Sequence, residues 1–210
     1  MKYILFSDIH CDRVACEQLV ERSEKVDFAI GAGDFALMRR GLQETIGVLA
    51  GIRVPTILVP GNHESHDELV GACEGIDNFH VLHGSEIELD GTLFCGIGGG
   101  IPVTPFGAWT VDFSEDHARR LLPSPGRNFV FVTHSPPFGC LDTLCDSQHV
   151  GSTAIRSFVE EARPSFVVCG HIHECASRQG EVEGIPVINA GPAGIEFEYP
   201  GGCARWREVR

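Results

Sequence analysis

The chain has 210 residues, 43% of them hydrophobic, and carries a formal net charge of -13. This length suits one globular domain with a sizeable core, so we expect a single domain over residues 1–210. The acidic balance disfavours binding of a nucleic-acid polymer, whereas a small anionic substrate stays compatible if bound metal ions offset the charge locally.

The cysteines and the N-terminus bear on the cellular compartment. Nine cysteines, an odd number without a C-x-x-C pair, do not fit a secreted disulfide framework. We therefore expect reduced thiols in a cytoplasmic protein. The apolar start, residues 1–6, is too short for a signal peptide or a membrane span, so no membrane association is predicted.

The first predicted strand covers residues 3–6 and runs into Asp8 and His10. Side chains two residues apart on an extended backbone face the same way, so this carboxylate and imidazole could hold one metal ion. A strand-end turn with a helix-capping Asp fits the D-x-H pattern equally well. A helix is predicted next, over residues 13–25.

The second and third predicted strands, residues 28–30 and 56–59, also end in polar residues. The second leads to Gly33 and Asp34, where glycine lets the backbone approach a ligand closely. Between them, apolar residues spaced over positions 42–50 predict a helix. The third strand stops at Pro60-Gly61 and is followed directly by Asn62, His63 and Glu64.

A helix should begin after Ser65, because Ser65 and Glu68 have the spacing of a capping box. Farther on, residues 87–95 alternate around Asp90-Gly91, which predicts a β-hairpin. The glycine-rich residues 96–100 lack the lysine of a phosphate-binding P-loop. Residues 114–122 predict a short helix.

The last part of the chain repeats the arrangement of a strand followed by histidine. A strand at 129–132 ends at His134, and a strand at 166–169 ends at His171 and His173, which on extended backbone would face one side. Between them lie a loop, residues 138–150, and a helix that begins after Ser152. One more strand is expected at 186–189, and the tail to Arg210, with Trp206, is expected to add an edge strand.

Five predicted strands thus deliver Asp, Asn or His to their ends. In α/β proteins these ends share the sheet edge where ligands bind. Each pattern is weak alone, but the five together predict a site for two metal ions.

The motifs D-x-H, G-D, G-N-H-E, a lone His and G-H-x-H occur here in the order of the calcineurin-like metallophosphoesterase superfamily, which this sequence resembles. Residues 133–137, 149–152 and 169–174 look most like its small single-domain members. The resemblance implies an α/β fold, a four-layer α/β/β/α sandwich of two mixed β-sheets flanked by helices. It also implies a dinuclear metal centre.

The resemblance assigns ligands to each ion. One metal would be held by Asp8, His10, Asp34 and His173, and the other by Asp34, Asn62, His134 and His171, with Asp34 bridging the pair. A carboxylate can span two ions that lie about 3.5–4 Å apart. Mixed nitrogen and oxygen ligands suit two Mn, Fe, Ni or Zn ions better than Ca or Mg.

The implied reaction is hydrolysis of a small phosphoester by a metal-activated hydroxide, with His63 as the general acid. The acid that orients His63 stays open, since Glu64 adjoins it in sequence but neighbours on an extended chain point apart. For substrate binding we name Asn62, His63 and His149; Asp142 and Asp146 share the loop of His149.

The sequence lacks the Asp-Arg that follows G-D in the Ser/Thr protein phosphatases of the superfamily, and it has no room for the DNA-binding domains of its repair nucleases. We therefore expect a phosphodiesterase acting on small diesters, cyclic nucleotides among them. A phosphomonoesterase is the alternative, and a non-catalytic metal-bound scaffold is a weaker one because His63 is present. A homo-oligomer remains open.

Overall fold

The computed structural model describes residues 1–145 and 147–199, and its first sheet has five strands in the order β11-β1-β2-β3-β4. The inner strands are parallel, and β11 pairs antiparallel with β1 at the edge. The strands are β1 (Lys2–Phe6), β2 (Phe28–Gly31), β3 (Thr56–Leu58), β4 (Phe79–Val81) and β11 (Ile195–Glu198).

The second sheet has six strands in the order β5-β6-β7-β8-β10-β9. Its middle pairs are parallel, and antiparallel hairpins form both edges. The strands are β5 (Ser85–Leu89), β6 (Thr92–Ile97), β7 (Val130–Thr133), β8 (Val167–Cys169), β9 (Arg178–Val182) and β10 (Ile185–Asn189).

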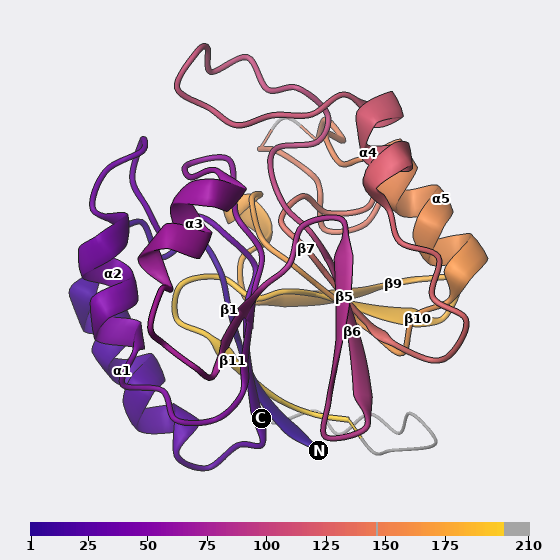
Figure 1. Cartoon of the computed structure of the whole chain (residues 1–210). Coiled ribbons are helices and arrows are strands. Elements are labelled where there is room, and N and C mark those ends of the chain that lie inside the picture. Colours follow the sequence, from indigo (N-terminus) through magenta and orange to yellow (C-terminus); the bar gives the residue numbers. More distant parts are fainter. Residues whose placement is uncertain (146, 200–210) are drawn as a thin grey trace.

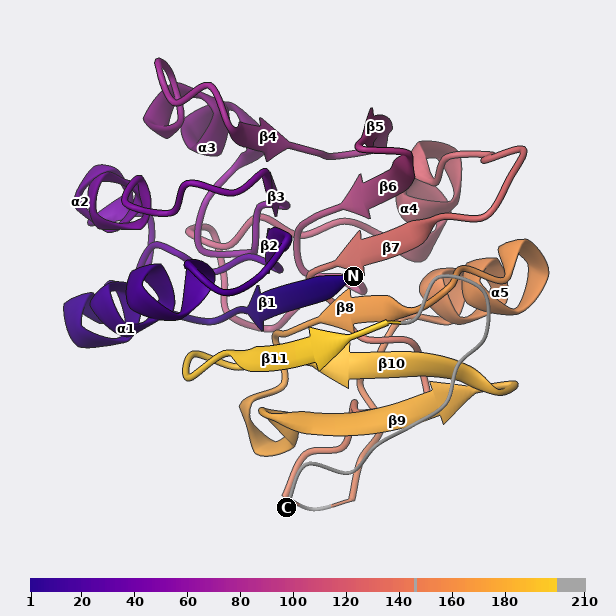
Figure 2. The ribbon, with the colours of Figure 1, turned by 90° about the horizontal axis from the view of Figure 1, so that it is seen from below.

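Helices cover the outer face of each sheet, as Figures 1 and 2 show. The first sheet carries α1 (Arg13–Ser23), α2 (Leu42–Leu49) and α3 (His66–Ala72); the second carries α4 (Glu115–Leu121) and α5 (Thr153–Ala162). A short 3-10 helix, η1 (His173–Cys175), follows β8. The four-layer α/β/β/α sandwich of two mixed sheets is therefore confirmed.

The alternation of side chains along β1 builds this layering. Tyr3 and Leu5 lie in the core between the two sheets, whereas Ile4 and Phe6 lie in the core beneath the helices of the first sheet. Both faces of the strand are buried, which explains why it reads as a continuous apolar run. A third core packs α4 and α5 onto the second sheet.

Most predicted elements are present, with bounds that differ by a few residues. The capping box at Ser65 and Glu68 is complete, and the hairpin turns at Asp90-Gly91. The short strands β4 and β9 were not predicted. The expected edge strand exists as β11, while Trp206 and the rest of the tail lie outside the described residues.

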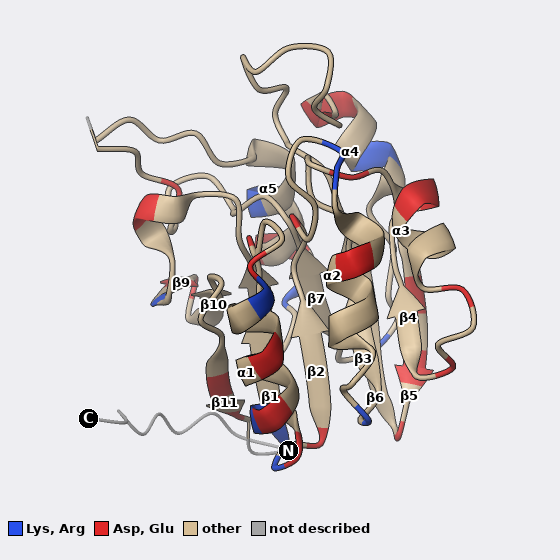
Figure 3. Cartoon of the chain, turned by 90° about the vertical axis from the view of Figure 1, so that its left-hand side faces the viewer, with Lys and Arg blue, Asp and Glu red and all other residues tan. Residues whose placement is uncertain are grey.

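Charge is spread unevenly over the molecule, with 29 acidic and 16 basic residues in the chain. Figure 3 shows acidic side chains on the helices that cover the first sheet. Such a surface repels polyanions, in keeping with the expectation from the sequence. None of the described helices has the length and apolar character that a membrane span requires.

Candidate metal centre

The loops that leave β1, β2, β3, β7 and β8 meet at one edge of the sandwich and bring the predicted ligands together. Three groups of side chains each place their ligand atoms within 4.8 Å of one another. The groups share members, so they form one continuous cluster: Asp8, His10 and His173; His10, Asp34 and His63; and Asp34, His134 and His171.

Asp34 lies at the middle of this cluster. Its Oδ2 is 3.7 Å from Nε2 of His10, and its Oδ1 is 3.5 Å from Nε2 of His134. The two carboxylate oxygens thus face different histidines. This is the arrangement that a bridging carboxylate needs, and it fits the predicted role of Asp34.

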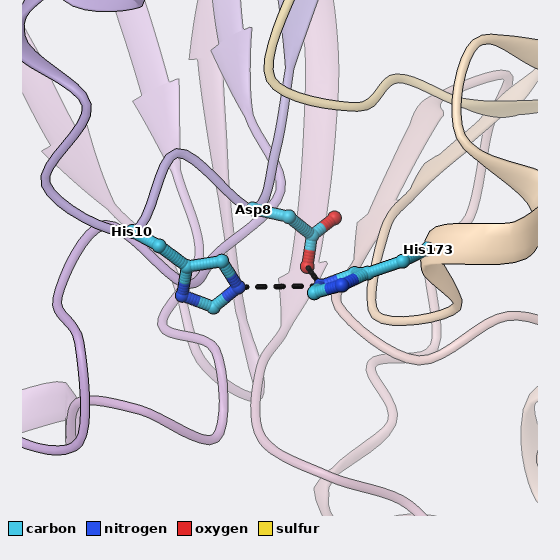
Figure 4. Close-up of side chains that lie close together, drawn as sticks. All are labelled: Asp8, His10 and His173. Atoms are coloured by element: carbon cyan, nitrogen blue, oxygen red, sulfur yellow. Dashed lines mark hydrogen bonds and ion pairs between the residues drawn. The ribbon is translucent and has the colours of Figure 1, made fainter.

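The first group is shown in Figure 4. Nε2 of His10 and Nε2 of His173 lie 3.2 Å apart, and Oδ1 of Asp8 lies 3.7 Å from Nε2 of His173. Two imidazole nitrogens and a carboxylate oxygen so close together form a donor set that a transition-metal cation would satisfy. The residues present therefore fit the implied metal.

Hydrogen bonds at Nδ1 distinguish the histidines that can act as ligands. Nδ1 of His10 lies 3.1 Å from the Ala36 carbonyl, and Nδ1 of His134 lies 2.7 Å from the Ala32 carbonyl. A carbonyl can only accept, so each ring donates from Nδ1 and turns an unprotonated Nε2 into the centre. Both are thereby prepared as metal ligands.

His63 has the opposite arrangement. The Met38 backbone N–H donates to Nδ1 of His63 at 3.0 Å, so the neutral ring carries its proton on Nε2. That Nε2 lies 3.7 Å from Oδ2 of Asp34. Although His63 belongs to one of the three groups, it faces the centre as a proton donor. Burial lowers its pKa, which keeps the ring neutral near pH 7.

Asn62 completes the predicted ligand set. Its Oδ1 lies 3.1 Å from Nε2 of His134, while its Nδ2 donates to Oγ1 of Thr110 at 2.9 Å. Thr110 in turn donates to Oδ1 of Asp112 at 2.8 Å. This chain of bonds turns the amide oxygen toward the centre. No spacing in the sequence linked Thr110 or Asp112 to Asn62.

Glu64 is fully buried and joins three loops. Its carboxylate accepts hydrogen bonds from the backbone N–H groups of Asp34 at 2.8 Å, Ala36 at 2.9 Å and Gly61 at 2.7 Å. Burial, followed by the Asp34 charge, raises the pKa of Glu64 to about 7 against the effect of these donors. The bonds of Glu64 position Asp34, while the bond at Nδ1 of His63 comes from Met38.

The loop after β8 is fixed from two sides. The His171 N–H donates to Oδ1 of Asp8 at 3.0 Å, and Nδ2 of Asn189, at the end of β10, donates to the carbonyls of Gly170 at 3.1 Å and Ile172 at 3.0 Å. Asn189 is a positioning residue that sequence reasoning missed, because its partners are backbone atoms.

Charges in the centre stabilise one another. Burial alone would raise the pKa of Asp34, but His134 and the other histidines hold it well below its usual range. Burial opposes protonation of His134, yet Asp34 raises the pKa of His134 to about 9. Burial lowers the pKa of His171 to about 4. A metal ion would have to displace the proton of His134.

The backbone at the site differs from our expectation. Asp8, His10, Asp34 and His171 have φ of 55°, 46°, 59° and 68°, so these residues are left-handed and not extended. Asp8 and His10 still meet, but through a turn. The prediction that His171 and His173 face one side is wrong, because they lie in different groups.

Glycine is required where two of the loops meet. A Cβ on Gly61 would lie 2.0 Å from Oδ1 of Asp34, and one on Gly33 would lie 2.6 Å from Nδ1 of His134. Any larger residue would displace a predicted ligand. The glycines that precede the polar residues therefore serve close approach between loops.

His149 lies apart from these groups. Its Nδ1 is 2.6 Å from Oδ1 of Asp142, whose other oxygen accepts from the N–H groups of Gly139 and Gly151, and its ring packs against Phe138. These contacts stiffen the loop between β7 and α5. A substrate-binding role for His149 stays a prediction, and Asp146 lies outside the described residues.

Comparisons with known proteins agree with this geometry. The family model described as calcineurin-like phosphoesterase matches residues 1–175. The uncharacterized protein MJ1162 of Methanocaldococcus jannaschii is 26% identical over 204 residues, which cover 91% of this chain and 88% of that protein.

Solved structures share the fold. The structure of TT1561 of Thermus thermophilus superimposes with a TM-score of 0.74 at 16% identity, covering 91% of this chain and 90% of that one. A novel archaeal phosphodiesterase gives a TM-score of 0.55 at 18% identity, covering 91% and 84% of the two chains.

Proposed function

The chain belongs to the calcineurin-like phosphoesterase family, and from that premise we propose that it hydrolyses small phosphodiesters, cyclic nucleotides among them, with two transition-metal ions. Family membership implies hydrolysis of phosphate esters. The choice of diesters and the pair of ions are our proposals. Manganese, iron, nickel and zinc are the candidates because the donors mix imidazole nitrogen with carboxylate and amide oxygen.

The observation that carries the proposal is the contrast between His63 and its neighbours. His10 and His134 turn an unprotonated Nε2 toward Asp34, whereas His63 turns a protonated Nε2 toward the same carboxylate. A scaffold that only stores metal needs ligands alone. A proton donor held beside the ligand set is what ester cleavage requires, because the departing oxygen must gain a hydrogen bond or a proton.

The roles of the residues follow from these contacts. Bound metal ions supply positive charge to the phosphate oxygens and lower the pKa of nearby water. Asp8, His10, Asp34 and His173 would hold one ion; Asp34, Asn62, His134 and His171 would hold the other. His63 donates from Nε2 to the leaving oxygen while Met38 fixes its ring. Full proton transfer as a general acid would need the imidazolium, whose formation requires the Met38 bond to break.

The charges around the centre favour a diester over a monoester. Within the described part of the chain, the ion pairs of Asp8 and Asp34 are all with histidines. Arg39, on the loop after β2, is paired with Glu68 at 2.7 Å. A phosphomonoester dianion would bring one more negative charge than a diester into an edge that offers no free arginine there.

The cellular setting is part of the same proposal. The eight described cysteines are free, which supports a reducing cytoplasmic compartment. We keep the single-domain organisation and the small-molecule partner as proposals, and a homo-oligomer stays compatible with them.

An activity screen of the metal-reconstituted protein tests the proposal. We expect bis(p-nitrophenyl) phosphate to be cleaved faster than p-nitrophenyl phosphate, with 2′,3′- and 3′,5′-cyclic nucleotides as the natural candidates. Faster cleavage of the monoester would favour the alternative reaction. Absence of turnover with every ester, in protein shown to contain metal, would leave the scaffold.

A matched variant examines His63. His63→Ala should keep its metal content and lose roughly 10²–10⁴-fold in rate on esters with poor leaving groups. A nitrophenolate departs with little help, so the loss should be smaller for nitrophenyl esters. Equal losses for both kinds of leaving group would contradict the donor role.

A further inference from the structure

The loop between β6 and α4, residues 98–113, arches over the metal edge at the top of Figure 1 and is held in a defined shape. The carboxylate of Asp112 accepts hydrogen bonds from the N–H of Thr104 at 2.8 Å and from the hydroxyls of Thr104 at 2.6 Å and Thr110 at 2.8 Å. Gly100 and Phe113 add backbone bonds across its base. The side chains between these anchors therefore have fixed positions.

The same loop is bonded to a predicted metal ligand. The Val111 N–H donates to the carbonyl of Asn62 at 2.9 Å, and Thr110 accepts from the side chain of Asn62 at 2.9 Å. The position of the loop relative to the metal centre is thus set by two hydrogen bonds. A residue next to Thr110 must lie close to the reacting groups.

That residue is Trp109. Its ring centroid lies 4.6 Å from that of His63 at an interplanar angle of 78°, and Phe106 lies nearly parallel to it, with centroids 6.0 Å apart and an angle of 16°. Trp109 is half-buried, whereas Phe106 is 54% exposed. Two parallel aromatic rings thus stand beside the proposed proton donor with part of their surface in water.

Exposed apolar side chains are concentrated around this edge. Of the eight large hydrophobic side chains that are exposed among the described residues, five lie in the loops that follow β2, β6 and β7: Leu37, Met38, Val103, Phe106 and Phe138. The backbone N–H of Met38 also holds His63. The rim of a polar centre is therefore apolar.

We propose that Trp109 and Phe106 form an aromatic platform that stacks against a flat aromatic group on the leaving side of the phosphoester. This inference rests on the proposed function. It follows from the contact between Trp109 and His63, because the group that receives the proton of His63 must lie within reach of both rings. A nucleobase or an aryl group offers the flat face that stacking needs, whereas a glycerol or sugar substituent would leave the platform in water.

Binding of two phosphonates to the manganese-loaded protein tests the platform without turnover. Phenylphosphonate and methylphosphonate differ by one ring, and carbon replaces the bridging oxygen, so neither is cleaved. Calorimetric titration should show phenylphosphonate bound about two- to tenfold more tightly, the range expected for a favourable aromatic pair. Trp109→Leu should abolish that preference and leave methylphosphonate affinity unchanged; Trp109→Phe should keep most of it.

Val103→Ser is the matched control, since it removes an exposed apolar side chain from the same loop outside the aromatic pair. It should keep the preference. Equal binding of the two phosphonates by the wild-type protein would overturn the platform, as would an equal loss of both affinities in Trp109→Leu. Failure of either phosphonate to bind the metal-loaded protein would instead contradict the proposed function.

A second pair of probes identifies the source of the ring. Adenosine 5′-monophosphate and ribose 5-phosphate, used as competitive inhibitors, differ only by the nucleobase. A preference for the nucleotide that disappears in Trp109→Leu would assign the platform to a nucleobase. A preference for phenylphosphonate alone would assign it to an aryl group attached close to phosphorus, and no preference in either pair would refute the platform.

Discussion

Loops of the five-stranded sheet carry both carboxylates and the amide of the candidate centre, whereas loops of the six-stranded sheet carry only histidines. The first set, which we call the acidic half, comprises Asp8, His10, Asp34 and Asn62. The second, the histidine half, comprises His134, His171 and His173. The negative charge that would attract metal ions therefore comes from one sheet alone.

The two halves are also held differently. Within the acidic half, the N–H groups of Asp8 and His10 donate to the carbonyls of Gly33 and Asp34, and Glu64 joins three loops with one carboxylate. The histidine half depends on the neutral amide of Asn189 and on bonds to the other sheet. The acidic half thus sets the geometry, and the histidine half docks onto it.

The largest effect should follow from removing the charge at the point where the halves meet. Asp34→Asn keeps an acceptor for the His63 N–H but loses the bridging charge. We expect loss of both ions and of nearly all turnover, beyond the roughly 10–100-fold effect of changing an outer-shell partner. Elemental analysis of metal-loaded protein measures the first, and a diesterase assay the second.

His171→Asn is the matched change in the histidine half. It removes one neutral ligand, so about one ion per chain should remain, held by the group of Asp8, His10 and His173. If Asp34→Asn also retained one ion, or if His171→Asn lost two, the unequal roles of the two halves would be wrong.

A second contrast concerns the buried groups that hold each half. Glu64→Gln places an amide against a backbone N–H and should lower the unfolding free energy of the metal-free protein by about 1–3 kcal/mol. Asn189→Leu should cost less, about 1 kcal/mol. In the described part of the chain Oδ1 of Asn189 is already buried without a partner, so its removal relieves one unfavourable atom. Urea unfolding in the presence of a chelator would compare them.

A cost for Asn189→Leu equal to or above that of Glu64→Gln would show that the histidine half is as firmly held as the acidic half. The result would not depend on bound metal, because both proteins are compared after chelation. It therefore separates the architecture of the site from its occupancy.

The pH dependence of the metal-free protein should reveal the pair between the halves. The pKa of His134 is raised from 6.5 to about 9 by Asp34, so its stabilisation is complete below about pH 6.5 and is lost as the pH rises through 9. Melting temperature should fall between pH 7.5 and 9.5 and metal affinity should rise as the proton leaves. His134→Asn should flatten both trends; an unchanged slope in that variant would assign them to other groups.

The smallest effect is expected outside both halves. His149→Ala should leave metal content intact and raise KM for the preferred phosphoester by about two- to tenfold, the worth of one hydrogen bond. A small model diester that does not reach the loop should be affected much less. Unchanged KM for both substrates would leave His149 as a partner of Asp142 that stabilises the loop.

The parts of the site visible in the sequence are those set by short-range patterns. Buried strands read as apolar runs, and the Gly, Asp, Asn and His that follow them mark the ends of β1, β2 and β3. The order of the motifs then placed the ligands on the sandwich. Seven predicted ligands and His63 do converge, while their assignment to individual metal ions stays a prediction.

The parts that the sequence did not reveal depend on partners far along the chain or on backbone atoms. Thr110 and Asp112 orient Asn62 from a different sheet's loop, and Glu64 and Asn189 bond to backbone groups that no residue type identifies. The left-handed backbone at Asp8 was missed because alternation of side chains holds only for extended residues.

The most direct test of the account is anomalous diffraction from crystals of the manganese-loaded protein. We predict two peaks per chain about 3.5–4 Å apart, the separation typical of two-metal sites. One should lie against Asp8, His10 and His173, the other against Asn62, His134 and His171, with Asp34 touching both. A single peak, or a second peak that Asp34 does not contact, would contradict the shared centre on which the proposed function rests.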